Sequence, residues 1–314
     1  MTAPIHADKK ALATNIWAVG GGKGGVGKSA LTTGIAMTLA IQGRRCIMID
    51  ADLGGANLHT FLGMSPPKHT ISDVLRDSSK NLQDILLATP FDNLSLISGA
   101  RAIHNVANLK HLQKEKLIRQ LFTLDADYIF IDLGAGSSFN VLDFFIAANN
   151  GLVVVTPTPT SIENTYHFLR AAYFRKLRQV MRELKAEGLV DSSLDEKDKI
   201  GIRSPRDLMH ALRQRDPEIG AHIDQAMLSF NPGLIVNQTQ RHEKRNLGKE
   251  IALASKDFLG INLMLAGTVR SDEQVLLSLN SRRPVITTYP NSSFAEDVRR
   301  IVQNLGLVAE MRNG

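Results

Sequence analysis

The sequence predicts an α/β fold in which a mainly parallel sheet of about eight strands carries helices on both faces. Short apolar segments alternate with longer amphipathic ones along the chain, as in repeated strand–helix units. Several apolar segments, including Tyr-Ile-Phe-Ile-Asp at 128–132 and Leu-Val-Val-Val-Thr at 152–156, are apolar at successive positions, which is typical of strands buried on both faces. Polar residues cluster where these segments end, and ligands bind at that edge of a parallel sheet. We expect strands at 16–20, 46–50, 94–98, 128–132, 152–156, 233–237, 263–268 and 284–287.

The chain has 314 residues, of which 43% are hydrophobic and 22% charged, enough to bury the core of one large domain. We expect a flexible segment at 1–14 and a single domain at 15–314. A polar stretch at about 187–232 interrupts the strand–helix pattern and reads as an insertion over the edge of the sheet. Proline opens each of two short helices expected within it, at 205–215 and 217–229. The insertion is either a surface for a partner or a cover for an edge strand.

Composition excludes several classes of protein. The single cysteine, Cys46, excludes an internal disulfide and a cysteine-rich metal site, and the histidines show no zinc-type spacing. There is no run of about 20 apolar residues, and residues 1–14 lack the apolar core of a signal peptide, so we expect a cytoplasmic protein. The net charge of +6 leaves open acidic partners, anionic lipid and nucleic acid.

The first predicted strand leads into Gly-Gly-Gly-Lys-Gly-Gly-Val-Gly-Lys-Ser at 20–29, and a helix is expected at 29–42. Gly43 then suits the left-handed position that ends a helix. A strand, a glycine-rich loop and a helix form the setting in which backbone N–H groups converge on phosphate oxygens. Lys28 is placed to reach the β- and γ-phosphates, and the Ser29 hydroxyl to ligate Mg²⁺.

Three aspartates follow the ends of predicted strands. Asp50 ends the segment 46–50, Asp52 lies two residues later, and Asp132 ends the segment 128–132. Carboxylates at such strand ends hold metal-bound water or orient an attacking water beside Mg²⁺ and a triphosphate. We therefore expect Ser29, Asp50 and Asp132 at the metal. Gly134 and Gly136 allow a turn beside the γ-phosphate that changes shape on hydrolysis.

Four motifs together carry a family resemblance: Lys-Gly-Gly-Val-Gly-Lys-Ser, Asp-Ala-Asp-Leu-Gly-Gly-Ala-Asn-Leu, Asp-Tyr-Ile-Phe-Ile-Asp-Leu-Gly-Ala-Gly and Thr-Pro-Thr-Pro-Thr-Ser-Ile. They resemble the deviant Walker A ATPases of the MinD/ParA family, nearest to its FlhG/FleN branch of flagellar-number regulators. The resemblance runs from about residue 15 to residue 305, broken by the insertion. It implies a P-loop NTPase fold of the SIMIBI type, ATP or ADP and Mg²⁺ as ligands, slow ATP hydrolysis, and an ATP-dependent homodimer.

The resemblance also implies roles for single residues. The lysine that matches Lys23 crosses the dimer to the partner's phosphates, and the aspartate that matches Asp52 is tied to water activation. Asn57 resembles a switch asparagine near the nucleotide. Asn237 matches the adenine-reading asparagine, although a strand-end residue that caps a turn would look the same. Pro290 lies in a loop that closes over the base. The predicted catalytic residues are Lys23, Lys28 and Asp52, and the predicted ATP-binding residues are Gly22, Lys23, Gly24, Gly25, Val26, Gly27, Lys28, Ser29, Ala30, Asn57, Asn237 and Pro290.

The chain departs from the family pattern at two places. Thr158 stands where relatives commonly have glutamate, and residues 1–14 lack the motif by which many FlhG proteins stimulate a partner GTPase. The tail after Ser292 is amphipathic, and a packed terminal helix is favoured over a membrane-binding helix because basic residues are few and Gly306 interrupts it. The apolar side of this tail consists of Phe294, Val298, Ile301, Val302 and Leu305.

The leading hypothesis for function is an ATPase switch that positions or regulates a cellular structure, through a protein partner and a surface such as the membrane or the cell pole. A second is a DNA-binding partition ATPase, because basic residues recur along one helix and in a second cluster. A solvated helix face is the alternative for this stripe, since Glu183 and Glu187 are interspersed. A third is an ATP-dependent amide ligase, for which no separate substrate domain is apparent. The basic residues are Arg175, Lys176, Arg178, Arg182 and Lys185, then Arg241, Lys244 and Arg245.

Overall fold

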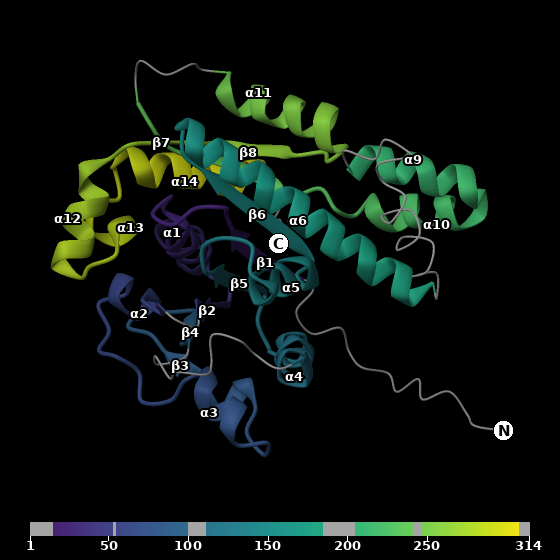
Figure 1. Cartoon of the computed structure of the whole chain (residues 1–314). Coiled ribbons are helices and arrows are strands. Elements are labelled where there is room, and N and C mark those ends of the chain that lie inside the picture. The colour runs from purple at the N-terminus through teal and green to yellow at the C-terminus, as the bar shows by residue number, and fades with distance from the viewer. Residues whose placement is uncertain (1–14, 53–54, 100–110, 185–204, 241–245, 308–314) are drawn as a thin grey trace, which may run out of the picture.

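The computed structural model describes residues 15–52, 55–99, 111–184, 205–240 and 246–307 (Figure 1). They form one eight-stranded sheet in the order β3-β4-β2-β5-β1-β6-β7-β8. Every neighbouring pair is parallel except β3 and β4. The strands are β1 Ile16–Gly20, β2 Cys46–Ala51, β3 Leu87–Ala88, β4 Leu94–Ile97, β5 Tyr128–Leu133, β6 Asn150–Val155, β7 Gly233–Thr239 and β8 Met264–Arg270. The α/β fold with a mainly parallel sheet is therefore confirmed, whereas the segment 1–14 and the first part of the insertion lie outside the described residues.

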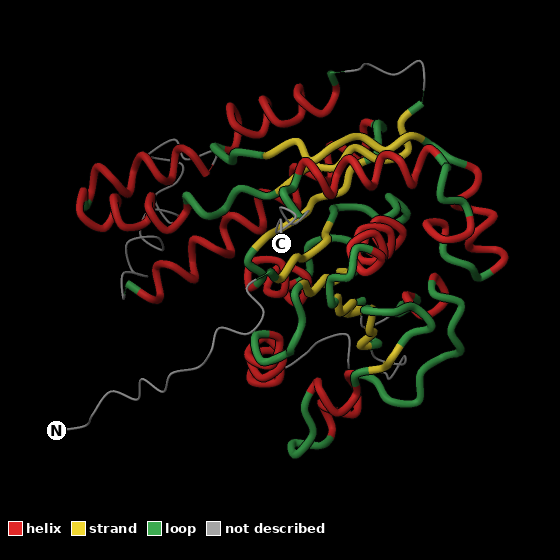
Figure 2. The backbone as a smooth tube through the Cα atoms, turned by 180° about the vertical axis from the view of Figure 1, so that it is seen from behind, coloured by secondary structure: helices red, strands yellow, loops and turns green. Residues whose placement is uncertain are grey.

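Two apolar layers enclose the sheet, and β1 contributes to both because its side chains alternate between the faces. Ile16 and Ala18 pack toward one layer, and Trp17 and Val19 toward the other. The view from behind shows the strands between the helices of these layers (Figure 2). The first layer contains α4 His111–Leu121, α5 Phe139–Ala147 and α6 Pro159–Glu183, and the second contains α1 Lys28–Ile41, α13 Val285–Thr288 and α14 Ser293–Asn304.

Shorter elements complete the fold. The α11 helix, Leu247–Ala254, covers β7 and β8, and the single π-helical turn η2, Ser255–Leu259, follows it and contacts α9. The remaining elements are α2 Leu58–Phe61, α3 Ile71–Arg76, η1 Leu82–Ile85, α9 Pro205–Arg215, α10 Pro217–Met227 and α12 Glu273–Ser281. No helix in the described part of the chain is both long enough and apolar enough to cross a bilayer.

The strand predicted at 284–287 is wrong. Val285–Thr288 forms the one-turn helix α13, with Pro284 at its N-cap. The β-branched run favours a strand, but Val285 and Ile286 are buried in the same cluster as α1, and this packing outweighs the local preference. The eighth strand is instead β3, a two-residue antiparallel strand that is too short to give a sequence pattern.

The described helices of the insertion do not lie over an edge of the sheet, so that expectation is also wrong. They pack on the second half of α6 and on η2, beside the end of the sheet where β7 begins (Figure 1). Leu208, Leu212 and Ile223 are buried in one cluster with Leu177 of α6. Asp216 opens α10 by accepting hydrogen bonds from the backbone N–H groups of residues 218 and 219. The insertion thus extends one hydrophobic layer, because its apolar faces are matched to α6.

The terminal helix α14 is packed, as expected. Phe294, Val298 and Ile301 are fully buried among residues of α1 and β8. Close contact depends on two glycines: a Cβ on Gly34 would lie 3.1 Å from the Phe294 ring, and one on Gly267 would lie 2.6 Å from Ile301. The apolar side of α14 is therefore occupied by the protein's own core.

Candidate nucleotide-binding site

The glycine-rich loop between β1 and α1 is held in a shape that only glycine allows at two positions. Gly27 has a φ of 90°, and a Cβ there would lie 2.2 Å from the Asn237 amide nitrogen. A Cβ on Gly22 would lie 1.9 Å from the backbone oxygen of Asn164 in α6. The loop is therefore pressed directly against α6 on one side and the end of β7 on the other.

Lys28 folds back over this loop. It is the first residue of α1 and is 8% exposed, and its Nζ donates to the backbone oxygen of Lys23 at 3.4 Å. Burial lowers the pKa of Lys28, and the carboxylates of Asp132 and Asp52 oppose this shift. An ammonium held across a glycine loop at the N-terminus of a helix is placed to bind a phosphate group.

A hydroxyl and a buried carboxylate lie together beneath the loop. The Ser29 hydroxyl donates to Asp132 at 2.6 Å, and Thr32, one turn later in α1, donates to the other carboxylate oxygen at 3.3 Å. Asp132 is 2% exposed, and burial raises its pKa to about 7, against the effect of the Ser29 hydrogen bond. An oxygen pair of this kind fits Mg²⁺, which is bound through one or two protein oxygens together with phosphate and water. Ser29 and Asp132 are the residues that would hold it.

Asp50 is paired with Asp132 across β2 and β5, but its carboxylate has a different set of partners. It accepts backbone N–H groups from Asp52 at 3.2 Å, Asn57 at 2.7 Å and Leu58 at 2.9 Å. Burial raises the pKa of Asp50 to about 6, and these hydrogen bonds oppose that shift. These three bonds make Asp50 an anchor of the segment that leads into α2. Its place at the metal stays a prediction.

Asp52 lies where three segments meet. A Cβ on Gly55 or on Gly134 would come within 3.2 or 3.3 Å of its carboxylate oxygens. The turn after β5 also touches the phosphate loop, because the Gly136 N–H donates to the Gly21 oxygen at 3.2 Å. Movement of this turn would therefore act on both Asp52 and the loop.

Lys23 makes a side-chain hydrogen bond outside its own loop. Its Nζ donates to the hydroxyl of Thr160 at the start of α6, at 3.1 Å, and the residue is exposed. Thr158 is the N-cap residue of α6, and its hydroxyl lies 3.3 Å from that of Thr156. The Lys23 ammonium is therefore bonded to a neutral hydroxyl.

Two residues at the end of β7 form hydrogen bonds to the backbone of the phosphate loop. Asn237 is 4% exposed, and its Nδ2 donates to the backbone oxygen of Val26 at 2.8 Å. Gln238, with a φ of 58°, donates to the Gly25 oxygen at 3.4 Å. The sequence interpretation missed Gln238, Thr32 and Thr160. Only Thr32 had a local signal, since it lies one turn after Ser29 on the same face of α1.

Three other predicted site residues, and the basic stripe, are placed as follows. Ala30 is buried in α1, and Asn57 is the N-cap residue of α2, close to the carboxylate of Asp50. Pro290 is not part of the phosphate loop. It lies between α13 and α14, and its backbone oxygen accepts a hydrogen bond from Arg299 at 2.9 Å. In the basic stripe of α6, Arg175 is bound to Asp143, and residues 185 and 241–245 lie outside the described part of the chain.

A glycine loop between a strand and a helix, spanned by one lysine and underlain by a hydroxyl–carboxylate pair, defines the class of P-loop nucleotide-binding proteins. The family described as ParA, NUBPL iron-transfer P-loop NTPase matches residues 13–180, which is more than half of the chain. The chain belongs to this ParA/MinD family of P-loop NTPases, and the resemblance in its motifs is confirmed.

Individual relatives cover nearly the whole chain. The antiactivator FleN of Pseudomonas aeruginosa is 27% identical over 92% of this chain and 85% of its own length. A putative septum site-determining protein MinD of Oltmannsiellopsis viridis is 34% identical, over 90% of this chain and 73% of its own. The solved structure of MinD from Pyrococcus horikoshii OT3, complexed with Mg-ADP, matches with a TM-score of 0.63 at 20% identity, covering 95% of this chain and 99% of that one. The match to the solved MinD structure shows a shared fold.

Proposed function

We propose that the protein is a molecular switch that binds ATP with Mg²⁺, forms a homodimer, and hydrolyses ATP slowly to ADP and phosphate. The proposal rests on the different hydrogen-bond partners of the two lysines in one loop. Lys28 spans its own phosphate loop, whereas the exposed Lys23 is bonded to Thr160 of α6, outside that loop. Lys23 is therefore available to the nucleotide of a second subunit, and each site would be complete only in the dimer.

Each side chain of the site has a separate role in phosphoryl transfer to water. Lys28 and the loop N–H groups hold the phosphates, and Asp132 orients the Ser29 hydroxyl. Mg²⁺, when bound, neutralises charge on the phosphate oxygens. Asp52, between Gly55 and Gly134, is placed to accept a hydrogen bond from the attacking water and orient it toward the γ-phosphate. When the γ-phosphate leaves after hydrolysis, the turn at 134–136 would be free to change its position.

Replacing Lys23 by alanine tests the proposal. We expect the variant to bind ATP as the wild-type monomer does, but to lose ATP-dependent dimerisation and the turnover that depends on it, because no ammonium then reaches the second site. Sedimentation velocity and phosphate release, both with ATP and Mg²⁺, measure the two effects. Lys249→Ala, an exposed lysine on α11, is the control. Wild-type dimerisation and turnover in Lys23→Ala would refute the proposal.

Asn237 supplies a base preference through its orientation. Because its Nδ2 donates to Val26, the amide presents its oxygen in the other direction. We infer that this oxygen accepts the N6 amino group of adenine, whereas O6 of guanine would meet it as a second acceptor. ATP rather than GTP is the nucleotide that this arrangement favours.

The Asn237→Asp variant should weaken ATP binding about 10-fold or more, because a carboxylate cannot donate to the Val26 oxygen and leaves it buried without a partner. Isothermal titration with ATP and Mg²⁺ measures the change. Gln238→Glu is the matched control, since it introduces the same charge beside the loop but loses only a longer and exposed hydrogen bond, so its effect on affinity should be clearly smaller. Equal affinity in Asn237→Asp and the wild type would contradict the orientation argument.

For the cellular role, we propose regulation of flagellar number or placement, or of a division site, by a cytoplasmic protein that acts peripherally at the membrane or cell pole through a protein partner. The relatives named antiactivator FleN and septum site-determining MinD support this range. Iron transfer, which the family description names, is not supported. The chain has one cysteine, Cys46, and burial raises the pKa of its thiol to about 12, so it is a poor thiolate ligand.

A further inference from the structure

Asp132 is the buried carboxylate of the site, and α1 supplies the hydroxyl that binds each of its two oxygens. Oδ2 accepts the Ser29 hydroxyl at 2.6 Å, and Oδ1 accepts the Thr32 hydroxyl at 3.3 Å. In the described part of the chain, Thr32 is the only donor to Oδ1. Rotation of a carboxylate about its Cβ–Cγ bond is soft, so one hydrogen bond leaves the group free to turn and a second fixes its plane. Thr32 therefore sets how Asp132 faces Ser29.

The Thr32 hydroxyl has one proton and two acceptors within reach. Besides Asp132, the backbone oxygen of Lys28 lies 2.9 Å away. In an α-helix that oxygen already accepts the N–H group of the residue four positions later, so it is satisfied without the hydroxyl. Asp132 and Thr32 are 2% and 0% exposed, so bulk water does not reach their contact. An ionised carboxylate is also the stronger acceptor, which favours donation of the proton to Asp132.

The orientation of Asp132 controls how the Ser29 oxygen can bind a metal ion. Ser29 donates its only side-chain proton to Asp132, which leaves the lone pairs of its oxygen for a metal. The direction of these lone pairs depends on where the accepting oxygen of Asp132 lies. A carboxylate that turned about its Cβ–Cγ bond would therefore move both of the oxygens that fit Mg²⁺ out of their relative positions.

We propose that Thr32 is a positioning residue, which fixes the carboxylate of Asp132 so that Ser29 and Asp132 present their oxygens together to Mg²⁺. The inference rests on the proposed binding of ATP with Mg²⁺. It predicts an effect confined to the metal. Removal of the Thr32 hydroxyl should weaken metal binding, whereas a nucleotide without metal, held by Lys28 and the loop N–H groups, should bind as before.

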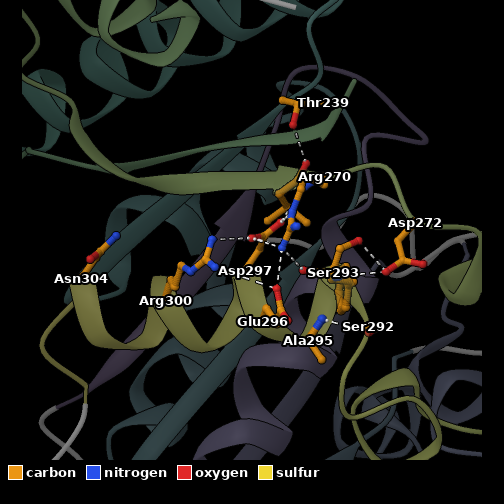
Figure 3. A network of polar contacts seen from close by, with 12 residues as sticks. Thr239, Arg270, Asp272, Ser292, Ser293, Ala295, Glu296, Asp297, Arg300 and Asn304 are labelled. Atoms are coloured by element: carbon orange, nitrogen blue, oxygen red, sulfur yellow. Dashed lines mark hydrogen bonds and ion pairs between the residues drawn. The ribbon is translucent and has the colours of Figure 1, made fainter. Parts of the chain in front are cut away.

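A second hydroxyl–carboxylate pair, outside the phosphate loop, provides a matched control. The hydroxyl of Ser293, the first residue of α14, donates to Asp272 at 2.8 Å (Figure 3). Asp272 also accepts the backbone N–H groups of Gln274 and Phe294, each at 3.0 Å. Ser293→Ala therefore removes a hydrogen bond of the same kind as the one from Thr32, and it leaves the contacts of Asp132 intact.

The test measures metal binding without turnover. Mn²⁺, which prefers the same oxygen ligands as Mg²⁺, is titrated into the complex of the full chain with ADP, and the electron paramagnetic resonance signal of the free ion gives its dissociation constant. We expect this constant to rise about 10-fold in Thr32→Val and in Thr32→Ala, the scale for losing a group that orients a metal ligand. Thr32→Ser, which keeps the hydroxyl, should restore most of the affinity, and Ser293→Ala should match the wild type. Isothermal titration with ADP in EDTA should give the same affinity for all of these proteins.

The outcomes separate the positioning role from the proposed function. Wild-type Mn²⁺ affinity in Thr32→Val and Thr32→Ala would refute the positioning role and leave nucleotide binding intact. An equal loss of ADP affinity in EDTA would also refute it, because the damage would then not be confined to the metal. A Thr32→Ser variant as weak as Thr32→Val would show that the methyl group matters and the hydroxyl does not. A wild-type protein that binds no ADP, or binds ADP but takes up no Mn²⁺, would refute the proposed function and the inference with it.

Discussion

Replacing Lys28 by alanine is expected to lower the rate of ATP hydrolysis at least about 100-fold, the scale seen when one charge-stabilising donor is removed from an active site. Lys28 is the ammonium that spans the phosphate loop. It should also be the main source of stabilisation by nucleotide. A wild-type protein at an ATP concentration 100 times its dissociation constant should gain about 2.7 kcal/mol, and the variant much less. Phosphate release and thermal unfolding with and without ATP measure the two effects.

The unliganded variant provides the internal control. Because Lys28 is 8% exposed and burial lowers its pKa, the ammonium is held in an unfavourable environment until a phosphate arrives. Lys28→Ala should therefore be at least as stable as the wild type without nucleotide. If it were markedly less stable, lost activity would reflect damage to the fold. Full ATP-induced stabilisation in the variant would contradict the assignment of the loop.

Replacing Asp143 by alanine should reduce the free energy of unfolding by about 3–5 kcal/mol, the range for removing one partner of a buried ion pair. Asp143 of α5 is bound by Arg175 of α6 at 2.6 and 2.9 Å and also by Lys114 of α4. Lys114 and Arg175 are 8% and 22% exposed, so the variant would leave two cations without their carboxylate in a largely buried position. Urea unfolding measures the loss.

The Arg213–Asp224 pair of the insertion is the matched control. It has the same two-bond geometry, at 2.6 and 2.7 Å, but its side chains are 51% and 36% exposed. Water screens such a pair, so Asp224→Ala should cost at most about 1 kcal/mol. Equal losses in the two variants would show that burial does not decide the strength of these pairs.

The contribution of Asp143 to the free energy of unfolding should fall at low pH. Burial alone would raise the pKa of Asp143, but hydrogen bonds from Arg175 and Lys114 outweigh it and hold the pKa below its usual value. The native state therefore binds the proton less readily than the unfolded chain, whose pKa is about 3.9. The stabilisation is full above that value and is lost as pH falls through the lower, native pKa. The difference between the wild type and Asp143→Ala should shrink below about pH 4.

Much of the site followed from the sequence because its chemistry is encoded over short distances. Glycines in the loop, Lys28 and Ser29 lie within eight residues, and Asp50 and Asp132 each end an apolar run. Parallel strands bring such ends to one edge, so the pairing of Asp50 with Asp132 was accessible to prediction. The three backbone partners of Asp50 could not be predicted, because they depend on how the chain after β2 folds back.

The errors in the fold have a related cause. The run Val-Ile-Thr-Thr favours a strand, yet it forms α13, because Val285 and Ile286 pack in the apolar cluster of α1. The insertion looks polar along the chain, but Leu208, Leu212 and Ile223 form one face once α9 and α10 are helical, and α6 covers that face.

By itself, the sequence determined that this protein is an α/β phosphate-binding protein with two lysines in its loop, since those properties depend on local pattern and residue type. Only the tertiary structure decided which groups meet. Lys23 and Thr160 are 137 residues apart in the chain, and Asn237 and Val26 are 211 apart. Contacts at such separations depend on the packing of whole helices and strands.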